Sequence, residues 1–388
     1  MRNLIRIGAV VIVILVAARV VFGLTTADTT NSPEPGAADA SPEPVSLVIG
    51  AAGDILPHSP LINQARGYAG GGPDDYDFSP MFTDVAGLLG AADLTLCHLE
   101  APMSAEASAM AASAGLTFDS PPQLAQALAG AGYGGCDFAS NHTLDQGVSG
   151  LADTQTAVEA AGLRYVGPTA RQEQSGQPAL YEVDGLSIAH LAYSYTVGNH
   201  TARPNTDVPD EAPWLADNLW PAVGAQGIIA DAQEARDAGA DFVIAAMHWG
   251  EEYRTEPTDE QRQIAREVLE SSAVDLILGT HVHVIQPCEK INGRYVFYGL
   301  GNFLSNQAPS TANSLKPETQ EGMITHVTLT RDGDGEVTSS ATVQPTRVRI
   351  ADHVIQLATP EQHPETFQRT MSTLSLLGES SCDAQPMS

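Results

Sequence analysis

Short apolar runs alternate along this chain with segments of helical periodicity, and this alternation restricts the possible folds more than any other feature of the sequence. Buried strands are expected over 45–51, 93–97, 136–139, 163–166, 187–193, 241–247, 274–278 and 295–298, and helices over 121–131, 148–161, 222–238 and 258–271. A hairpin is expected over 323–330 and 337–350, with its turn at 332–335. Strand–helix alternation of this kind predicts an α/β fold built in layers.

Five of the expected strands end in, or shortly before, residues that can bind a metal ion. In chain order these residues are Asp54 and His58, His98 and Glu100, Asn141, His142 and Asp145, His248, and His281 and His283. Because the carboxyl ends of parallel strands open into one crevice, we expect these side chains to converge on a single pocket. The spacing of His281 and His283 places both side chains on the same side of an extended segment.

The mixture of imidazole, carboxylate and amide groups indicates a metal centre. Histidine and carboxylate together suit borderline divalent metals, so we expect one or two ions of Mn, Zn or Fe that activate water and stabilise an oxyanion. Taken singly, each residue has a structural alternative: a histidine at a strand end is usually hydrogen-bonded, and Glu100 can cap a loop. The whole ordered set is poorly explained by structural roles alone. His190, in the middle of an expected strand, is interpreted as a hydrogen-bonded core histidine.

The N-terminal segment predicts export. Arg2 and Arg6 precede an apolar run over 7–18, which indicates that residues 1–24 are a signal peptide or an N-terminal membrane anchor. Residues 25–46 are rich in Pro, Ala and Ser and are expected to form a disordered linker. The expected layout is completed by one domain over 47–350 and a C-terminal extension over 351–388. The domain is therefore expected outside the cytoplasm, either membrane-anchored or secreted.

The charge and the cysteines restrict the partners and the covalent framework. The formal net charge is −29, from 18 basic and 47 acidic residues, which argues against nucleic acid as a partner. The same charge disfavours a polyanionic substrate unless metal ions or local basic residues compensate.

Four cysteines are too few for a disulfide scaffold. In an oxidising compartment Cys97, Cys136, Cys288 and Cys382 can pair, and the sequence leaves their pairing open.

Six ordered motifs carry a resemblance to a known family. They are Gly53-Asp54, His98-Leu99-Glu100, the segment 140–147 (SNHTLDQG), the segment 248–253 (HWGEEY), the segment 279–283 (GTHVH) and the segment 299–303 (GLGNF). Together they resemble the CapA (PgsA-like) family of poly-γ-glutamate capsule biosynthesis, within the calcineurin-like metallophosphoesterase superfamily. Two departures stand out. His98 occupies a position where this family usually has Asn, and Leu56 occupies the histidine position of the Asp-x-His motif of phosphoesterases.

The resemblance implies a fold and a set of site residues. The fold is a four-layer α/β/β/α sandwich. The implied metal ligands are Asp54, Glu100, Asn141, His248, His281 and His283. His142 and Asp145 are the implied catalytic residues, with His142 as a general acid or a group that stabilises the transition state. Further residues assigned to the site are His58, His98, Glu252 and Asn302, of which Glu252 is expected to orient a ligand.

Two functions follow from the resemblance. The first is an exported metal-dependent hydrolase that attacks a phosphoester or a γ-glutamyl amide through a metal-activated water. The second is a non-catalytic component that binds or exports the polymer within the capsule synthase complex. The implied partners are poly-γ-glutamate, or a related small anionic or peptide substrate, and a membrane synthase complex.

Overall fold

The computed structural model describes residues 43–72, 75–104, 117–201 and 203–387. The expected signal peptide or anchor and most of the expected linker lie outside these ranges. Within them, no helix has the length and the apolar character needed to cross a membrane. The described chain from Glu43 onward belongs to one compact unit, and Val45 already begins its first strand.

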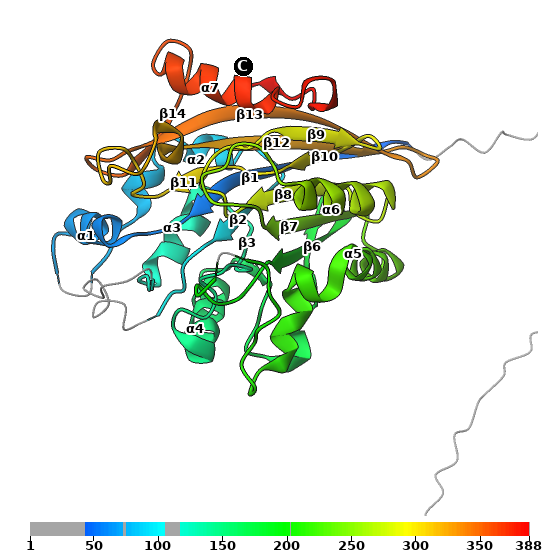
Figure 1. Ribbon diagram of the computed structural model, residues 1–388, viewed down its shortest axis with the longest axis horizontal. Coiled ribbons are helices and arrows are strands. Elements are labelled where there is room, and N and C mark those ends of the chain that lie inside the picture. Colours follow the sequence, from blue (N-terminus) through cyan, green and yellow to red (C-terminus); the bar gives the residue numbers. More distant parts are fainter. Residues whose placement is uncertain (1–42, 73–74, 105–116, 202, 388) are drawn as a thin grey trace, which may run out of the picture. The chain divides into compact units, whose positions relative to one another are not determined.

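The first of two sheets has nine strands and carries the N-terminal half of the predicted site (Figure 1). Its main path runs β14-β13-β12-β1-β2-β3-β4, with β11 beside β1 and β15 beside β13. The strands are β1 (Val45–Ile55), β2 (Leu94–Leu99), β3 (Gly135–Asp137), β4 (Arg164–Val166), β11 (Asn302–Leu304), β12 (Glu321–Arg331), β13 (Val337–Arg349), β14 (Val354–Leu357) and β15 (Gln385–Pro386). Strands β1 to β4 are parallel, so their carboxyl ends lie at one edge. The predicted hairpin is confirmed as β12–β13.

The second sheet has six strands in the order β5-β6-β7-β8-β10-β9. The strands are β5 (Ala179–Val183), β6 (Leu186–Ser194), β7 (Phe242–His248), β8 (Leu276–Thr280), β9 (Cys288–Ile291) and β10 (Arg294–Phe297). The four central strands are parallel, and β5 and β9 pair antiparallel at the two edges. Strands β7 and β8 therefore present their carboxyl ends together.

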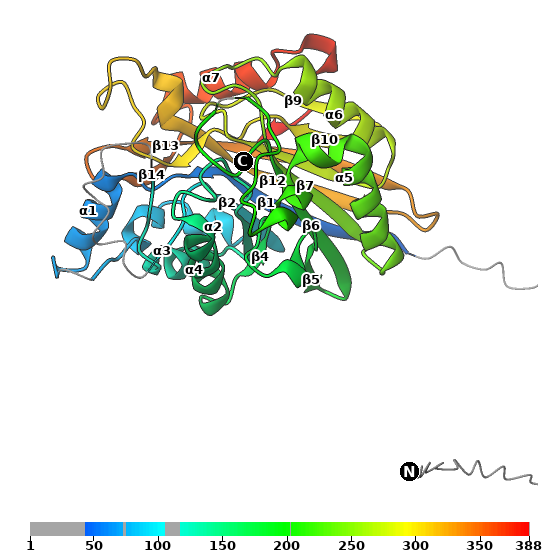
Figure 2. The same cartoon turned by 60° about the horizontal axis from the view of Figure 1, so that its bottom comes forward.

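Helices cover the outer face of each sheet, which confirms the α/β/β/α sandwich (Figures 1 and 2). The helices on these faces are α1 (Ser59–Tyr68), α2 (Ala86–Leu89), α3 (Gln123–Ala131), α4 (Gly147–Ala160), α5 (Trp220–Asp237) and α6 (Asp259–Glu270). A further helix, α7 (Pro364–Leu374), packs beside β13. One buried apolar cluster joins α1–α4 to the nine-stranded sheet, and another joins α5 and α6 to the six-stranded sheet. A third cluster fills the space between the sheets, where Leu47 and Ile49 of β1 belong to the same core as Ile244 of β7.

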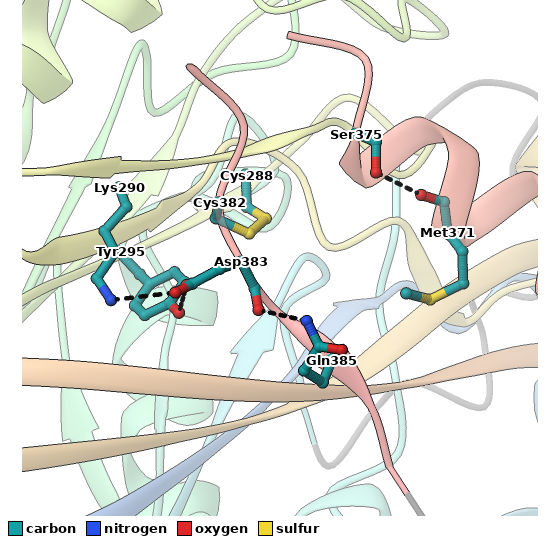
Figure 3. The surroundings of a disulfide bond; sticks show 8 residues. All are labelled: Cys288, Lys290, Tyr295, Met371, Ser375, Cys382, Asp383 and Gln385. Carbon is teal, nitrogen blue, oxygen red and sulfur yellow. Dashed lines mark hydrogen bonds and ion pairs between the residues drawn. A yellow bond between two sulfur atoms is a disulfide. The ribbon is translucent and has the colours of Figure 1, made fainter. Parts of the chain in front are cut away.

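Two disulfides resolve the pairing that the sequence left open. Cys97 of β2 is bonded to Cys136 of β3, and these two residues are directly paired across the parallel strands. Cys288 of β9 is bonded to Cys382 in the C-terminal segment (Figure 3). All four cysteines are therefore in disulfide bonds, and none is a free thiolate that could bind a metal ion.

The C-terminal segment packs against the rest of the unit. Beside the second disulfide, the Tyr295 hydroxyl donates to the carboxylate of Asp383, and Lys290 Nζ lies 3.6 Å from the same carboxylate (Figure 3). Leu374 of α7 is buried in the cluster between the sheets. Strand β14 extends the first sheet beside β13, so residues after 350 contribute both a strand and a helix to the fold.

Candidate metal centre

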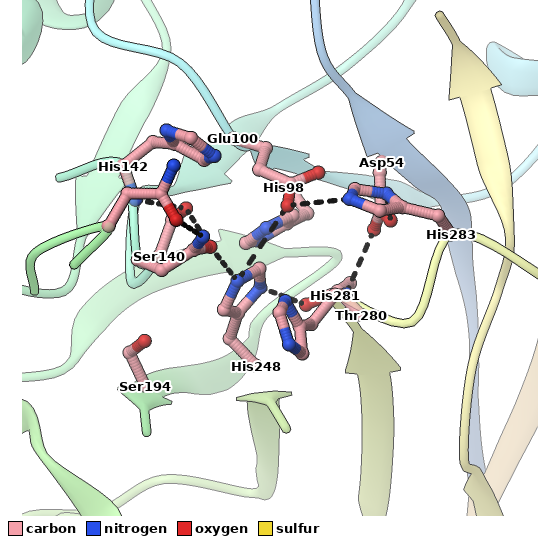
Figure 4. Close-up of polar contacts among 12 residues, drawn as sticks. Asp54, His98, Glu100, Ser140, His142, Ser194, His248, Thr280, His281 and His283 are labelled. Atoms are coloured by element: carbon pink, nitrogen blue, oxygen red, sulfur yellow. Dashed lines mark hydrogen bonds and ion pairs between the residues drawn. The ribbon is translucent and has the colours of Figure 1, made fainter. Parts of the chain in front are cut away.

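The first sheet delivers Asp54, Glu100 and Asn141 to one end of the space between the sheets. Asp54 lies at the end of β1 and Glu100 follows β2 (Figure 4). Asn141 lies in the turn after β3. All three are at most 1% exposed. The backbone of β1 comes very close to its neighbour here, because Asp54 N donates to Gly301 O at 2.8 Å. A side chain on Gly53 would place its Cβ 1.9 Å from that oxygen, so only glycine fits before Asp54.

The second sheet delivers the histidines. His248 is the last residue of β7, and His281 and His283 follow the end of β8. His248 Nε2 lies 2.8 Å from Asn141 Oδ1, which joins the two sheets, while its Nδ1 lies 3.1 Å from Thr280 Oγ1. Five strand ends therefore converge on one buried cluster of side chains, as expected.

The backbone that carries His281 and His283 differs from the prediction. These residues have φ angles of 92° and 58°, so the segment is not extended and the alternation argument for it was wrong. Left-handed conformations are unfavourable for histidine and are commonly found where function requires a particular orientation. The bend nevertheless brings both rings to the centre, with their centroids 6.2 Å apart.

Two groups of side chains have ligand atoms close enough to hold a metal ion, and Glu100 belongs to both. One group consists of Glu100, His248 and His281, and the other of Asp54, His98 and Glu100; within each group the ligand atoms lie within 4.8 Å of one another. Both carboxylate oxygens of Glu100 are buried without a hydrogen-bond partner in the described chain. A buried carboxylate without hydrogen-bond donors is costly, so these residues suit a divalent cation.

Burial and neighbouring charges shift the pKa values of the residues in the centre. Burial lowers the pKa values of His248 and His281 well below the ordinary range, and neighbouring imidazoles lower them further, so both rings are neutral. Burial raises the pKa of Glu100, and the negative charge of Asp54 adds to the effect. Burial by itself lowers the pKa of His98, but the adjacent Asp137 raises it to about 9.

His283 lies between the two carboxylates of the first sheet. Its Nδ1 is 3.1 Å from Asp54 Oδ2 and 3.1 Å from Asn302 Oδ1, and its Nε2 is 3.5 Å from Glu100 Oε1. The Asn302 amide donates to Thr319 O and Gln307 Oε1, which holds its oxygen toward His283. Asn302 therefore orients His283 and has no free oxygen directed at the two groups of ligand candidates.

His142 and Asp145 form a pair beside the candidate ligands. His142 Nδ1 lies 2.8 Å from Asp145 Oδ2, which also accepts a hydrogen bond from Phe118 N at 2.6 Å. The Phe118 ring lies edge-on to His142 with the centroids 4.7 Å apart. Because Nδ1 is held by Asp145, Nε2 is the nitrogen available to a substrate. A cavity of about 630 Å³ adjoins this pair and is lined by Asp145, Asn199 and His200 among others.

Two of the predicted site residues lie at the edge of the centre. His58 Nδ1 is bonded to Leu56 O at 2.9 Å, and its ring contacts Phe118 rather than a candidate ligand. Burial lowers the pKa of His58 to about 4. Glu252 is exposed and, among the described contacts, makes no hydrogen bond to a candidate ligand. That Glu252 orients a ligand stays a prediction.

Sequence reasoning missed several residues that contact the predicted site residues. Among them, Asp137 bonds to His98, Phe118 packs on His142, and the tilted ring of Tyr195 has its centroid 4.6 Å from that of His281. Tyr195 directly follows the carboxyl end of β6. The position after a strand end, which identified the histidines, could therefore have identified Tyr195 as well. Phe118 comes from a loop that has no sequence signal for a site.

The two sheets and the centre between them define the class of protein. It is a four-layer α/β/β/α protein with candidate ligands for divalent metal ions. Residues 48–307 match the family described as bacterial capsule synthesis protein PGA_cap, and the chain belongs to that family. The resemblance to capsule biosynthesis proteins is thereby confirmed.

Individual relatives agree with the family. The chain is 35% identical over 171 residues to a PGA biosynthesis protein CapA of Bacillus subtilis (strain 168), covering 44% of this chain and 42% of that protein. It is 30% identical over 184 residues to a capsule biosynthesis protein CapA of Bacillus anthracis, covering 47% and 42%. The matched segments thus span less than half the length of these relatives. Among solved structures, the calcineurin-like phosphoesterase YfkN from Bacillus subtilis aligns with a TM-score of 0.43 at 15% identity, over 86% of this chain and 99% of that chain.

Proposed function

We propose that this protein is an exported, metal-dependent hydrolase of capsule synthesis. The observation that carries the proposal is the position of Glu100, whose two oxygens are buried without hydrogen-bond partners, within the described chain, between two groups of potential ligands. A structural glutamate would be expected to have its oxygens satisfied by donors. A cation at this position explains the arrangement.

The surrounding residues have distinct roles in this proposal. Asp54, Glu100, His248 and His281, which belong to the two groups of ligand candidates, would hold the metal together with Asn141 and His283, which contact members of these groups. A bound divalent ion supplies Lewis-acid activation of water and of the scissile group. His142 donates a proton from Nε2 to the leaving group, and Asp145 holds the imidazole in the required orientation through Nδ1.

The proposed location and biological context have separate support. Disulfides persist in oxidising compartments outside the cytoplasm, and both Cys97–Cys136 and Cys288–Cys382 are formed. Relatives bear the names of PGA biosynthesis and polyglutamine synthesis accessory proteins. The substrate proposed is therefore a γ-glutamyl amide, or a phosphoester, presented near a membrane synthase complex.

The charge of the molecule limits how the polymer binds. With a formal net charge of −29, the protein repels a long polyanion. The cavity beside His142 is lined by two aspartates, Asp145 and Asp207, and its only titratable base among the described lining residues is His200. These residues favour a short chain end held at the metal over a long stretch of polymer.

Elemental analysis and a substrate panel test the proposal. The full chain is purified, its metal content is measured, and phosphodiesters and γ-glutamyl peptides are assayed with Mn²⁺, Zn²⁺ and Fe²⁺. We expect bound metal and turnover, both strongly reduced by His248→Ala. Metal and polymer binding without turnover of any substrate would instead favour the non-catalytic polymer-binding or export component. Protein without metal affinity would reject both forms of the metal proposal.

A further inference from the structure

A row of buried polar side chains crosses the carboxyl edge of the first sheet. Asp54 of β1 pairs with His98 of β2, and His98 pairs with Asp137 of β3. None of the three is more than 3% exposed. Side chains at paired positions of parallel strands point to the same side, so the row places the His98 ring between two carboxylates.

The contacts of His98 distinguish its two ring nitrogens. Nδ1 lies 2.7 Å from Asp137 Oδ1, whereas Nε2 is buried without a hydrogen-bond partner among the residues that the structure describes. The same ring stacks on His248 with the centroids 4.8 Å apart, so it faces the centre (Figure 4). A ligand atom of His98 lies within 4.8 Å of ligand atoms of Asp54 and Glu100.

We propose that His98 is a metal ligand through Nε2 and that Asp137 is the residue that positions it. Asp54, His98 and Glu100 then hold one cation, and Glu100 shares a second with His248 and His281. This inference rests on the proposed metal-dependent function and adds to it the number of ions and the origin of one ligand.

The neighbouring strand supplies an imidazole that β1 lacks. Leu56, two residues after Asp54, is a buried apolar side chain, and the next histidine along the chain, His58, belongs to neither group of ligand candidates. His98 is the imidazole that is paired in register with Asp54. The ligand missing from one strand is thus provided by the adjacent one.

Asp137 makes the ring suitable for ligation. A carboxylate that accepts from one ring nitrogen fixes the tautomer and orientation of the imidazole and leaves the other nitrogen for the metal. The Cys97–Cys136 disulfide joins the two strands one residue before this pair, with the Cα atoms 4.4 Å apart, and so fixes their register. One imidazole with two carboxylates suits Zn²⁺, Mn²⁺ or Fe²⁺ better than Mg²⁺ or Ca²⁺.

A competing explanation makes a different prediction. A protonated His98 could occupy the place of the cation by pairing with Asp137 and the nearby carboxylates. The centre would then hold one ion fewer, and replacing His98 by a neutral residue would not reduce the number of bound metals. Counting the ions therefore separates the two explanations.

The test is a metal titration of the full chain. Wild type and the variants His98→Gln and Asp137→Ala are stripped with a chelator and loaded with Zn²⁺ or Mn²⁺. Ions per chain are then counted by mass spectrometry of the metal, and affinities are measured by calorimetry. We expect two ions in wild type and one in His98→Gln. Asp137→Ala should retain two ions, with the dissociation constant of one site raised roughly 10- to 100-fold.

Controls separate a local effect from misfolding. His363→Gln changes a histidine at the start of α7, outside the centre, and should bind two ions. Thermal unfolding in chelator shows whether each variant is folded. If His98→Gln is not folded, the metal affinities of Asp137→Ala test the assignment of His98 in its place. Two ions bound with unchanged affinity by His98→Gln, or one ion in both wild type and His98→Gln, would overturn the assignment of His98 while leaving the hydrolase proposal intact. No metal bound by wild type would overturn both.

Discussion

At the scale of single residues, Glu100 connects the two candidate cation positions. Glu100→Gln keeps the shape of the side chain but removes the charge that both groups share. We expect loss of metal binding and activity. The melting temperature of the metal-free protein should be unchanged or higher, because the substitution removes a buried carboxylate whose oxygens have no hydrogen-bond partner in the described chain. Calorimetry and thermal unfolding in chelator measure the two effects, and a large fall in the metal-free melting temperature would indicate a structural role for Glu100.

His190 provides a prediction about acid stability. The sequence correctly identified it as a core residue, but neither ring nitrogen has a hydrogen-bond partner in the described structure. Burial lowers its pKa from 6.5 to about 4. The unfolded chain therefore binds a proton more readily than the native protein below pH 6.5. The free energy of unfolding is therefore not reduced by His190 above pH 6.5, and it decreases as the pH falls toward 4.

Replacing His190 should reduce the loss of folding stability that occurs as the pH falls from 7 to 4. Wild type is expected to lose roughly 3 kcal/mol more than His190→Leu between pH 7 and pH 4, from the shift of this one group. Urea unfolding in the presence of chelator, repeated across this pH range, measures the difference without interference from bound metal. Parallel stability curves for the two proteins would show that His190 does not titrate as argued.

At the scale of secondary-structure elements, the close approach of β1 to the segment before β11 determines where Asp54 lies. Gly53→Ala would bring a Cβ against Gly301 O, so one of the two backbones must move. We expect a loss of about 1–3 kcal/mol in stability together with weaker metal binding. Gly130→Ala in α3 is the matched control, because nothing lies within 4 Å of its added Cβ, and it should be neutral or slightly stabilising. Equal effects of the two substitutions would argue against the packing explanation.

The elements that the sequence predicted are those with the strongest local signals. Strands β1, β7 and β8 are continuous apolar runs, and α6, within the helix predicted over 258–271, begins at a capping box between Thr258 and Gln261. The edge strands β5 and β14 and the C-terminal helix α7 were not expected, because they are short or only partly buried. The polar residues at the ends of the strands allowed us to predict that these ends lie close together. The bend at His281 and His283 depends on tertiary contacts that no local pattern encodes.

At the scale of the whole molecule, the two disulfides join different pairs of segments and should have different consequences. Removing Cys288–Cys382 by a double alanine substitution frees the C-terminal segment, which contributes no candidate ligand within the described chain, so we expect a loss of roughly 2–4 kcal/mol with metal content unchanged. Removing Cys97–Cys136 should cost a similar amount and also weaken metal binding, because that bond lies next to His98 and Asp137. Chemical denaturation and metal counting on both double variants test this. Metal loss in the first variant, or full metal affinity in the second, would contradict it.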